Sequence, residues 1–235
     1  MKLPADTIPV ESPTSAPAGE CRILLVDDHP ITCQGVAALI NTQTDMKIVG
    51  QARSAPAALE MVEKLDPHIA VVDVSLQGTS GIEFVKNALS MRPRLLVLMM
   101  SMYEELLYAP RAFRAGARGY IMKHEASEKI VTALRQIREG KAYISSQLKE
   151  KLAERVLVSR SHEMEDPVEQ LSDREMEVFE LIGDGYTTRQ IAKRLNLSVK
   201  TIDSYREHLK VKLHIDGASD LLQHAIRWTK TNHLA

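Results

Sequence analysis

The sequence predicts an α/β domain built on a five-stranded, doubly wound parallel sheet, followed by a small all-α domain of four helices. Two observations carry this prediction. From Cys21 to about Tyr143, five short apolar runs alternate with segments of helical periodicity, the pattern of parallel strands joined by crossover helices. From residue 168 onward, helix-start signals recur and no strand pattern is found.

The residues before the first strand differ in composition from the rest. Residues 1–20 contain Pro4, Pro9, Pro13 and Pro17 among small and polar residues. Such a segment cannot bury enough apolar surface to order itself, so we expect a flexible arm.

The α/β domain, residues 21–143, follows this arm. Its apolar runs are short and bounded by turn signals, as in strands that are covered on both faces. We expect strands over 22–26, 46–50, 68–73, 94–99 and 118–122, and helices near 31–42, 55–65, 80–90, 104–115 and 126–139.

Pro110 falls inside the fourth helical segment. Proline is tolerated in the first turn of a helix but costs about 3 kcal/mol in its interior. We therefore expect this helix to begin near Ala109 and residues 102–108 to form a mobile loop.

A polar, charged stretch over 144–167 predicts a linker with a helical middle (148–158) that stops at Pro167. Residues 168–235 then form the helical domain. Ser172-x-x-Glu175 and Thr187-x-x-Gln190 are capping boxes that open its first two helices. Ser198 caps a third helix over about 199–212, and a fourth runs from about Ser219 to Trp228.

The bulk composition bounds the class of protein. The formal net charge is −1, so any nucleic-acid site must come from local charge patterning. Cys21 and Cys33 have no metal-binding spacing and are expected as reduced core thiols. No apolar stretch approaches the roughly 18 residues that span a bilayer, and no signal peptide is evident. We expect a cytoplasmic protein without a membrane partner.

Charged residues follow three of the expected strands. Asp27 and Asp28 end the first strand, Asp73 ends the third and Lys123 ends the fifth. Ligands of open parallel sheets bind beyond the carboxyl ends of the strands, so these side chains are expected at one edge. Carboxylates held close together repel unless a cation lies among them, and oxygen ligands suit Mg²⁺.

These four residues, together with Ser101 after the fourth strand, resemble the receiver domain of two-component response regulators, which has a flavodoxin-like fold. The resemblance covers residues 22–140. It implies that Asp73 accepts a phosphoryl group from a partner sensor histidine kinase. It also implies that Asp28, Asp73 and the backbone carbonyl of Ser75 ligate Mg²⁺, with Asp27 acting through water.

The resemblance further implies a switch. Lys123 would supply fixed positive charge to the phosphoryl oxygens, and the Ser101 hydroxyl would donate to them. The aromatic ring that turns inward in response would be that of Tyr120, for which a plain packing role stays open.

The sequence departs from the receiver pattern near this site. Gln77 stands where a proline is common, Met102 where a small residue is usual, and His124 where a proline often follows the lysine. Met102 would narrow access to the pocket. His124 is interpreted as a surface residue.

The C-terminal region resembles the LuxR-type helix-turn-helix, on Leu171–Glu175, Gly185, Ile191-Ala192, Ser198–Ile202 and Lys212-Leu213. Its recognition helix, roughly 199–212, would enter the major groove of double-stranded DNA. Segment 186–212 carries seven basic residues against Asp203 and Glu207, which supports this interpretation independently. The DNA-binding candidates are Lys200, Thr201, Ser204, Tyr205, Arg206 and Lys210. Asp203 and Glu207 are weaker candidates for contacts with bases.

In relatives the final helix pairs two copies on DNA. Leu221, Leu222 and Ala225 are the candidates for such a homodimer seam, and a plain core face is an equal alternative. A two-fold dimer would bind an inverted repeat.

The expected function is therefore a non-enzymatic, DNA-binding transcriptional response regulator of the NarL/FixJ family, in which phosphorylation of Asp73 controls dimerisation and DNA binding. One alternative keeps DNA binding with a receiver-like docking domain that works unphosphorylated. A second is an aspartyl-phosphate phosphatase. Those enzymes usually place an acid two residues after the nucleophile, where this chain has Ser75.

Overall fold

The computed structural model describes residues 7–8, 19–76, 79–103, 105–151 and 167–233. The chain divides into two compact units, Met1–Arg155 and Val156–Ala235, each of which is described by itself. Among the described helices, none combines the length with the apolar composition that crossing a membrane needs.

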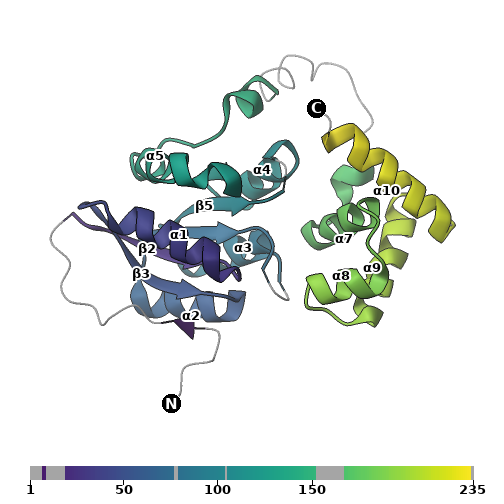
Figure 1. The fold of residues 1–235 in the computed structure, drawn as a ribbon, viewed down its shortest axis with the longest axis horizontal. Helices are drawn as coiled ribbons and strands as arrows, with labels where there is room; N and C mark the ends of the chain where they lie inside the picture. Colours follow the sequence, from purple (N-terminus) through teal and green to yellow (C-terminus); the bar gives the residue numbers. More distant parts are fainter. Residues whose placement is uncertain (1–6, 9–18, 77–78, 104, 152–166, 234–235) are drawn as a thin grey trace. The chain divides into compact units, whose positions relative to one another are not determined.

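The first unit is a sheet with helices on both faces (Figure 1). The strand order is β1-β3-β2-β4-β5-β6, and all strands are parallel except β1. The strands are β1 (Thr7–Ile8), β2 (Cys21–Val26), β3 (Met46–Ala52), β4 (Ile69–Asp73), β5 (Leu96–Ser101) and β6 (Gly119–Met122). The five parallel strands confirm the predicted doubly wound sheet.

Five helices cover this sheet. They are α1 (Pro30–Asn41), α2 (Ala55–Leu65), α3 (Gly81–Met91), α4 (Glu105–Arg114) and α5 (Ala126–Arg138). α1 contacts α5, whereas α2 contacts α3 and α3 contacts α4. Alternate residues of the central strands, such as Ile23 and Leu25, join α1 and α5 in one buried cluster. Burial on both faces explains why these strands are continuous apolar runs.

The fifth strand in the sheet order, β5, begins two residues later than the sequence predicts. The amide of Leu95 donates to the carbonyl of Arg92, which closes a turn around Pro93 and delays the strand. As a result Ser101 is the last residue of β5, paired in register with Met122, instead of following the strand.

β1 was not predicted. The expected arm 1–20 lies mostly outside the described residues, but Thr7 and Ile8 pair antiparallel with Ala52 and Gln51 at the edge of the sheet. A two-residue strand that pairs with a distant segment has no periodic pattern of its own, so the composition of the arm conceals it.

The prediction that α4 begins near Ala109 is wrong. The helix begins at Glu105 and contains Pro110 in its interior. Proline removes one helical hydrogen bond, yet Tyr108 and Ala109 are completely buried and α4 contacts β6. Tertiary packing therefore offsets the local cost of proline, which sequence propensity alone does not include.

Residues 146–151 are helical, so the helix begins two residues earlier than predicted for the linker, and the remaining predicted residues, 152–158, lie outside the described residues. The second unit contains η2 (Pro167–Gln170), α7 (Asp173–Gly183), α8 (Thr188–Arg194), α9 (Val199–Lys212) and α10 (Ala218–His233). Both capping boxes and the Ser198 cap form as predicted. α10 extends five residues beyond the expected end at Trp228.

Candidate metal centre and nucleic-acid interface

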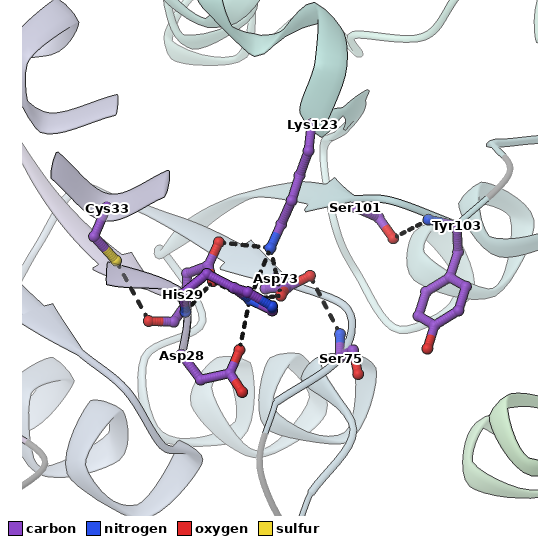
Figure 2. Close-up of polar contacts among 9 residues, drawn as sticks. Asp28, His29, Cys33, Asp73, Ser75, Ser101, Tyr103 and Lys123 are labelled. Carbon is purple, nitrogen blue, oxygen red and sulfur yellow. Dashed lines mark hydrogen bonds and ion pairs between the residues drawn. The ribbon is translucent and has the colours of Figure 1, made fainter. Parts of the chain in front are cut away.

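The carboxyl edge of the parallel sheet gathers the charged residues predicted from the sequence. Asp27 and Asp28 follow β2, Asp73 ends β4 and Lys123 follows β6. In Figure 2 the side chain of Lys123 reaches Asp73, and Asp28 lies near them. Asp27 and Asp73 are buried, at 1% and 2% exposed. The strand-end argument therefore places these residues correctly.

Lys123 neutralises part of this cluster. Its Nζ lies 2.7 Å from Oδ2 of Asp73 and 2.8 Å from Oδ2 of Asp27. Burial, followed by the negative charge of Asp73, raises the pKa of Asp27. Burial alone would lower the pKa of Lys123, but the carboxylates of Asp73 and Asp27 raise it. The lysine is thus held charged against the carboxylate at the end of β4.

His29 is a member of the cluster that the sequence reasoning missed. Its Nδ1 lies 2.9 Å from Oδ1 of Asp28, 3.1 Å from Oδ1 of Asp27 and 3.7 Å from Oδ2 of Asp73. The Asp73 carboxylate, with those of Asp28 and Asp27, raises the pKa of His29 to about 9, against the effects of burial and Lys123. The Asp-Asp-His-Pro run was the available signal, because Pro30 fixes the backbone that aims the ring.

The cluster has the donor atoms of a divalent cation site. Asp27, Asp28, His29 and Asp73 each offer one ligand atom, and these atoms lie within 4.8 Å of one another. Oδ2 of Asp27 and Oδ1 of Asp28 are buried and accept no hydrogen bond from the described residues, although Lys123 and His29 lie at ion-pair distances. Carboxylate oxygens with spare lone pairs fit a hard cation.

The loop after β4 also supports Asp73. The amide of Ser75 donates to Oδ1 of Asp73 over 3.3 Å. That contact places Ser75 beside the cluster, and the role predicted for its carbonyl oxygen stays a prediction. Gln77 lies outside the described residues.

Ser101 and Tyr120 are linked through Tyr103. The hydroxyl oxygen of buried Ser101 accepts a hydrogen bond from the Tyr103 amide at 2.9 Å. The hydroxyl of Tyr120 donates to the Tyr103 carbonyl at 2.8 Å. The ring of Tyr120 is 1% exposed, so it already points inward. Tyr103 in turn stacks on Tyr108, with ring centroids 4.9 Å apart.

The other departures from the receiver pattern lie at the surface. Met102 is 69% exposed. His124 is exposed, in agreement with its interpretation as a surface residue, and it does not belong to the group around Asp73.

In the second unit, α8 and α9 form the two helices of a helix-turn-helix. Ser198 caps α9, whose buried face includes Ile202 and Leu209. Val199 is 43% exposed. Lys200 and Ser204 are exposed, whereas Thr201, Tyr205, Arg206 and Lys210 are half-buried. Two basic residues of α9 have acidic partners: Lys210 pairs with Glu207 at 2.8 Å and Lys212 with Glu175 at 2.7 Å.

The prediction of a dimer seam needs a correction. Leu221 and Ala225 are completely buried, on the face of α10 that packs against α7. The backbone of Ala225 lies close to Gly183 of α7. A Cβ on Gly183 would lie 2.7 Å from the carbonyl oxygen of Ala225. These two residues belong to the core of the helical unit, the alternative left open above. Leu222 is 39% exposed and remains a candidate.

Comparison with known proteins matches both units. The family model "Response regulator receiver domain" matches residues 23–135, and "Bacterial regulatory proteins, luxR family" matches residues 169–225.

Similar proteins match most of the chain or a part of it. The oxygen regulatory protein NreC of Staphylococcus aureus is 30% identical over 211 residues, covering 88% of this chain and 97% of NreC. RcsB from Salmonella enterica serovar Typhimurium was solved bound to promoter DNA in the presence of the phosphomimetic BeF3⁻. It is 26% identical to this chain. The match covers 87% of this chain and 97% of RcsB, with a TM-score of 0.54. A solved LuxR-family response regulator from Aurantimonas is 31% identical. The match covers 59% of this chain and 99% of that one, with a TM-score of 0.55.

Proposed function

This chain belongs to the NarL/FixJ family of response regulators, and from that premise we propose that it is a DNA-binding transcriptional regulator switched by phosphorylation of Asp73 by a partner histidine kinase. The observation that carries the proposal is the buried Asp73 carboxylate, held 2.7 Å from Lys123 inside a group of acidic donors. We expect it to work in the cytoplasm and to accept phosphoryl groups without turning over a substrate of its own.

The residues of the cluster divide the work of phosphoryl transfer. Asp73 is the nucleophile, because its carboxylate ends β4 at the edge where ligands of parallel sheets bind. Asp28, Asp73 and the Ser75 carbonyl would hold Mg²⁺, with Asp27 acting through water, and the ion would supply charge neutralisation at the phosphoryl oxygens. Lys123 provides fixed positive charge at the same place at no cost in reorganisation.

Ser101 and Tyr120 then communicate the modification. The Ser101 oxygen accepts from the Tyr103 amide but keeps its own hydrogen, which is free to be donated to a phosphoryl oxygen. Moving Ser101 toward Asp73 pulls on Tyr103, whose carbonyl is bonded to Tyr120 and whose ring stacks on Tyr108. A shift of a few kcal/mol in this network is enough to make a minor state dominant.

The helical unit supplies the output. α9 presents Lys200, Arg206 and Lys210 for phosphate contacts, with Thr201, Ser204 and Tyr205 beside them. The RcsB structure with promoter DNA and a phosphomimetic supports the pairing of a modified receiver with bound DNA. Two copies arranged as a homodimer would read an inverted repeat, with Leu222 as an exposed candidate for the contact.

The test uses the full chain, acetyl phosphate and Mg²⁺. On a phosphate-affinity gel, we expect the wild type to shift and Asp73→Asn to remain in place. Asp66→Asn is the matched control, because Asp66 lies away from the cluster in a left-handed conformation that asparagine tolerates, and it should shift like the wild type.

A DNA mobility assay on the same samples completes the test. Phosphorylated wild type should bind operator DNA more tightly than Asp73→Asn. Absence of any modification in the wild type, or a shift that persists in Asp73→Asn, would overturn the phosphoacceptor assignment. Equal DNA binding with and without modification would favour a docking receiver instead. Multiple turnover on a generic phosphate ester would revive the phosphatase alternative.

A further inference from the structure

His29 belongs to the acidic cluster, but the proposed phosphoryl transfer gives no role to its imidazole. Its Nδ1 lies 2.9 Å from Oδ1 of Asp28 and 3.1 Å from Oδ1 of Asp27. It also lies 3.7 Å from Oδ2 of Asp73 and 3.4 Å from Nζ of Lys123. In Figure 2 the ring lies beside the Asp28 and Asp73 carboxylates, although the His29 side chain is 62% exposed.

The local backbone holds the ring in this place. His29 is the N-cap residue of α1, with an extended conformation (φ −93°, ψ 106°), and Pro30 occupies the first helical position. A residue before proline is restricted to such conformations. The backbone amide of His29 donates to Oδ1 of Asp27 over 2.8 Å, and its side chain makes no capping hydrogen bond. The ring nitrogen therefore remains available for the cluster.

We propose that His29 is a further ligand of the divalent cation and that its nitrogen shifts the preference of the site from Mg²⁺ toward Mn²⁺. The proposal rests on the proposed function, since it concerns the cation of that same site. Mg²⁺ prefers oxygen ligands, whereas an imidazole suits transition metals, so a mixed set of three carboxylates and one nitrogen favours Mn²⁺ relative to an oxygen-only set.

Two features of the cluster support this role. One atom from each of Asp27, Asp28, His29 and Asp73 fits within 4.8 Å, the compactness that shared coordination requires. Oδ2 of Asp27, in a residue only 1% exposed, has the positive Nζ of Lys123 at 2.8 Å, so this buried oxygen already lies beside a cation.

The His29 side chain is 62% exposed, which makes it accessible to a cation from solvent and replaceable without disturbing the core. His29→Asn keeps the backbone amide and replaces the ring by a short amide. His124→Asn is the matched control, because His124 is exposed and follows Lys123 but lies outside the group of donors. Unchanged thermal unfolding without metal should verify that both variants fold.

The experiment titrates the full-length protein with Mn²⁺ and follows it by electron paramagnetic resonance, with Mg²⁺ as competitor. We expect His29→Asn to weaken Mn²⁺ binding on the order of tenfold, the scale on which metal sites respond to loss of a ligand or its support. Mg²⁺ binding should change less than about threefold, because Mg²⁺ keeps oxygen and water ligands. His124→Asn should match the wild type for both ions.

Electron spin echo spectra of bound Mn²⁺ identify the ligand directly. A nitrogen coupling should be present in the wild type and in His124→Asn and absent in His29→Asn. A wild type that binds Mn²⁺ without that coupling, a coupling that persists in His29→Asn, or an equal loss of Mn²⁺ and Mg²⁺ affinity would overturn the role of His29 alone. A wild type that binds neither ion would overturn the proposed metal site as well.

Discussion

At the scale of single residues, Gly81 fixes the backbone beneath the phosphoacceptor. A Cβ on Gly81 would lie 1.9 Å from the carbonyl oxygen of Asp73 and 3.1 Å from Cα of Val74. The amide of Gly81 also donates to the carbonyl of Val74 at 2.7 Å. Only a residue without a side chain lets α3 begin this close to the end of β4.

We therefore predict that Gly81→Ala displaces Asp73 and lowers the free energy of unfolding by about 1–3 kcal/mol, the usual cost of overpacking. Phosphorylation by acetyl phosphate should slow in parallel. The measurements are urea unfolding and gel-based phosphorylation rates. Gly35→Ala is the control: its Cβ meets no atom within 4 Å, and alanine should stabilise α1 by about 0.5–1 kcal/mol. Equal behaviour of the two variants would contradict the prediction.

The residues of the acidic cluster also mark the limit of sequence reasoning. Asp27, Asp28, Asp73 and Lys123 could be predicted, because strand ends of a parallel sheet share an edge regardless of side-chain detail. His29 was missed: the Asp-Asp-His-Pro run places it next to the carboxylates in the sequence, but that run does not fix the direction of an exposed ring. Met102 is 69% exposed, and its predicted effect on access to the pocket stays a prediction.

At the scale of elements, a side-chain hydrogen bond links β6 to the segment before α4. Tyr120 donates from β6 to the carbonyl of Tyr103. Tyr120→Phe should lower the free energy of unfolding by about 1 kcal/mol, the net value of one such bond, and speed amide exchange at residues 102–108. Hydrogen exchange followed by mass spectrometry checks this.

The control for this variant is Tyr186→Phe in the helical unit, whose hydroxyl accepts a hydrogen bond from Arg194. It should leave exchange at residues 102–108 unchanged. If Tyr120→Phe also leaves that exchange unchanged, the hydrogen bond does not hold the segment. The same segment shows why the start of α4 was predicted wrongly: burial of Tyr108 and Ala109 comes from distant residues, which local propensity does not include.

A second link between elements joins α7 to α9. Glu175, in the first turn of α7, accepts a hydrogen bond from Lys212 at the end of α9 and from the amide of Ser172. Burial alone would raise the pKa of Glu175, but these hydrogen bonds lower it below its ordinary value of 4.5. A lowered carboxyl pKa contributes stability that is complete above pH 4.5 and is lost as the pH falls below it.

Glu175→Gln should therefore destabilise the helical unit by about 1–2 kcal/mol at pH 7 and flatten the loss of stability below pH 4.5. Glutamine preserves the capping box, so the change isolates the charge. Fluorescence of Trp228, the only tryptophan, follows unfolding of this unit because it packs beside Phe179. Glu60→Gln, in an exposed pair with Lys64, is the control and should cost less than about 0.5 kcal/mol. If the stability of Glu175→Gln still falls steeply below pH 4.5, the charge of Glu175 is not the cause of that loss.

At the scale of the whole molecule, the net charge of −1 conceals a separation of charge along the chain. The positive residues between 186 and 212 are Arg189, Lys193, Arg194, Lys200, Arg206, Lys210 and Lys212. Only Asp203 and Glu207 oppose them in that segment. The positive potential needed for DNA is therefore concentrated on α8 and α9, and each acidic residue there reduces it.

Glu207 is the acidic residue whose removal should strengthen DNA binding. Its side chain is 68% exposed and pairs with Nζ of Lys210 at 2.8 Å. The carboxylate therefore repels DNA phosphates, and it holds the Lys210 ammonium that could otherwise contact them. Glu207→Gln should raise affinity for a duplex of unrelated sequence at low salt and steepen the slope of log K against log salt by about 1, the value of one added phosphate contact. Fluorescence anisotropy across a salt series measures both quantities. Glu83→Gln, an exposed change in α3 of the receiver unit, alters the net charge equally and should leave the slope unchanged. If both variants gain the same DNA affinity and the same change in salt slope, the total charge of the protein governs DNA binding, not the position of the charge on α9.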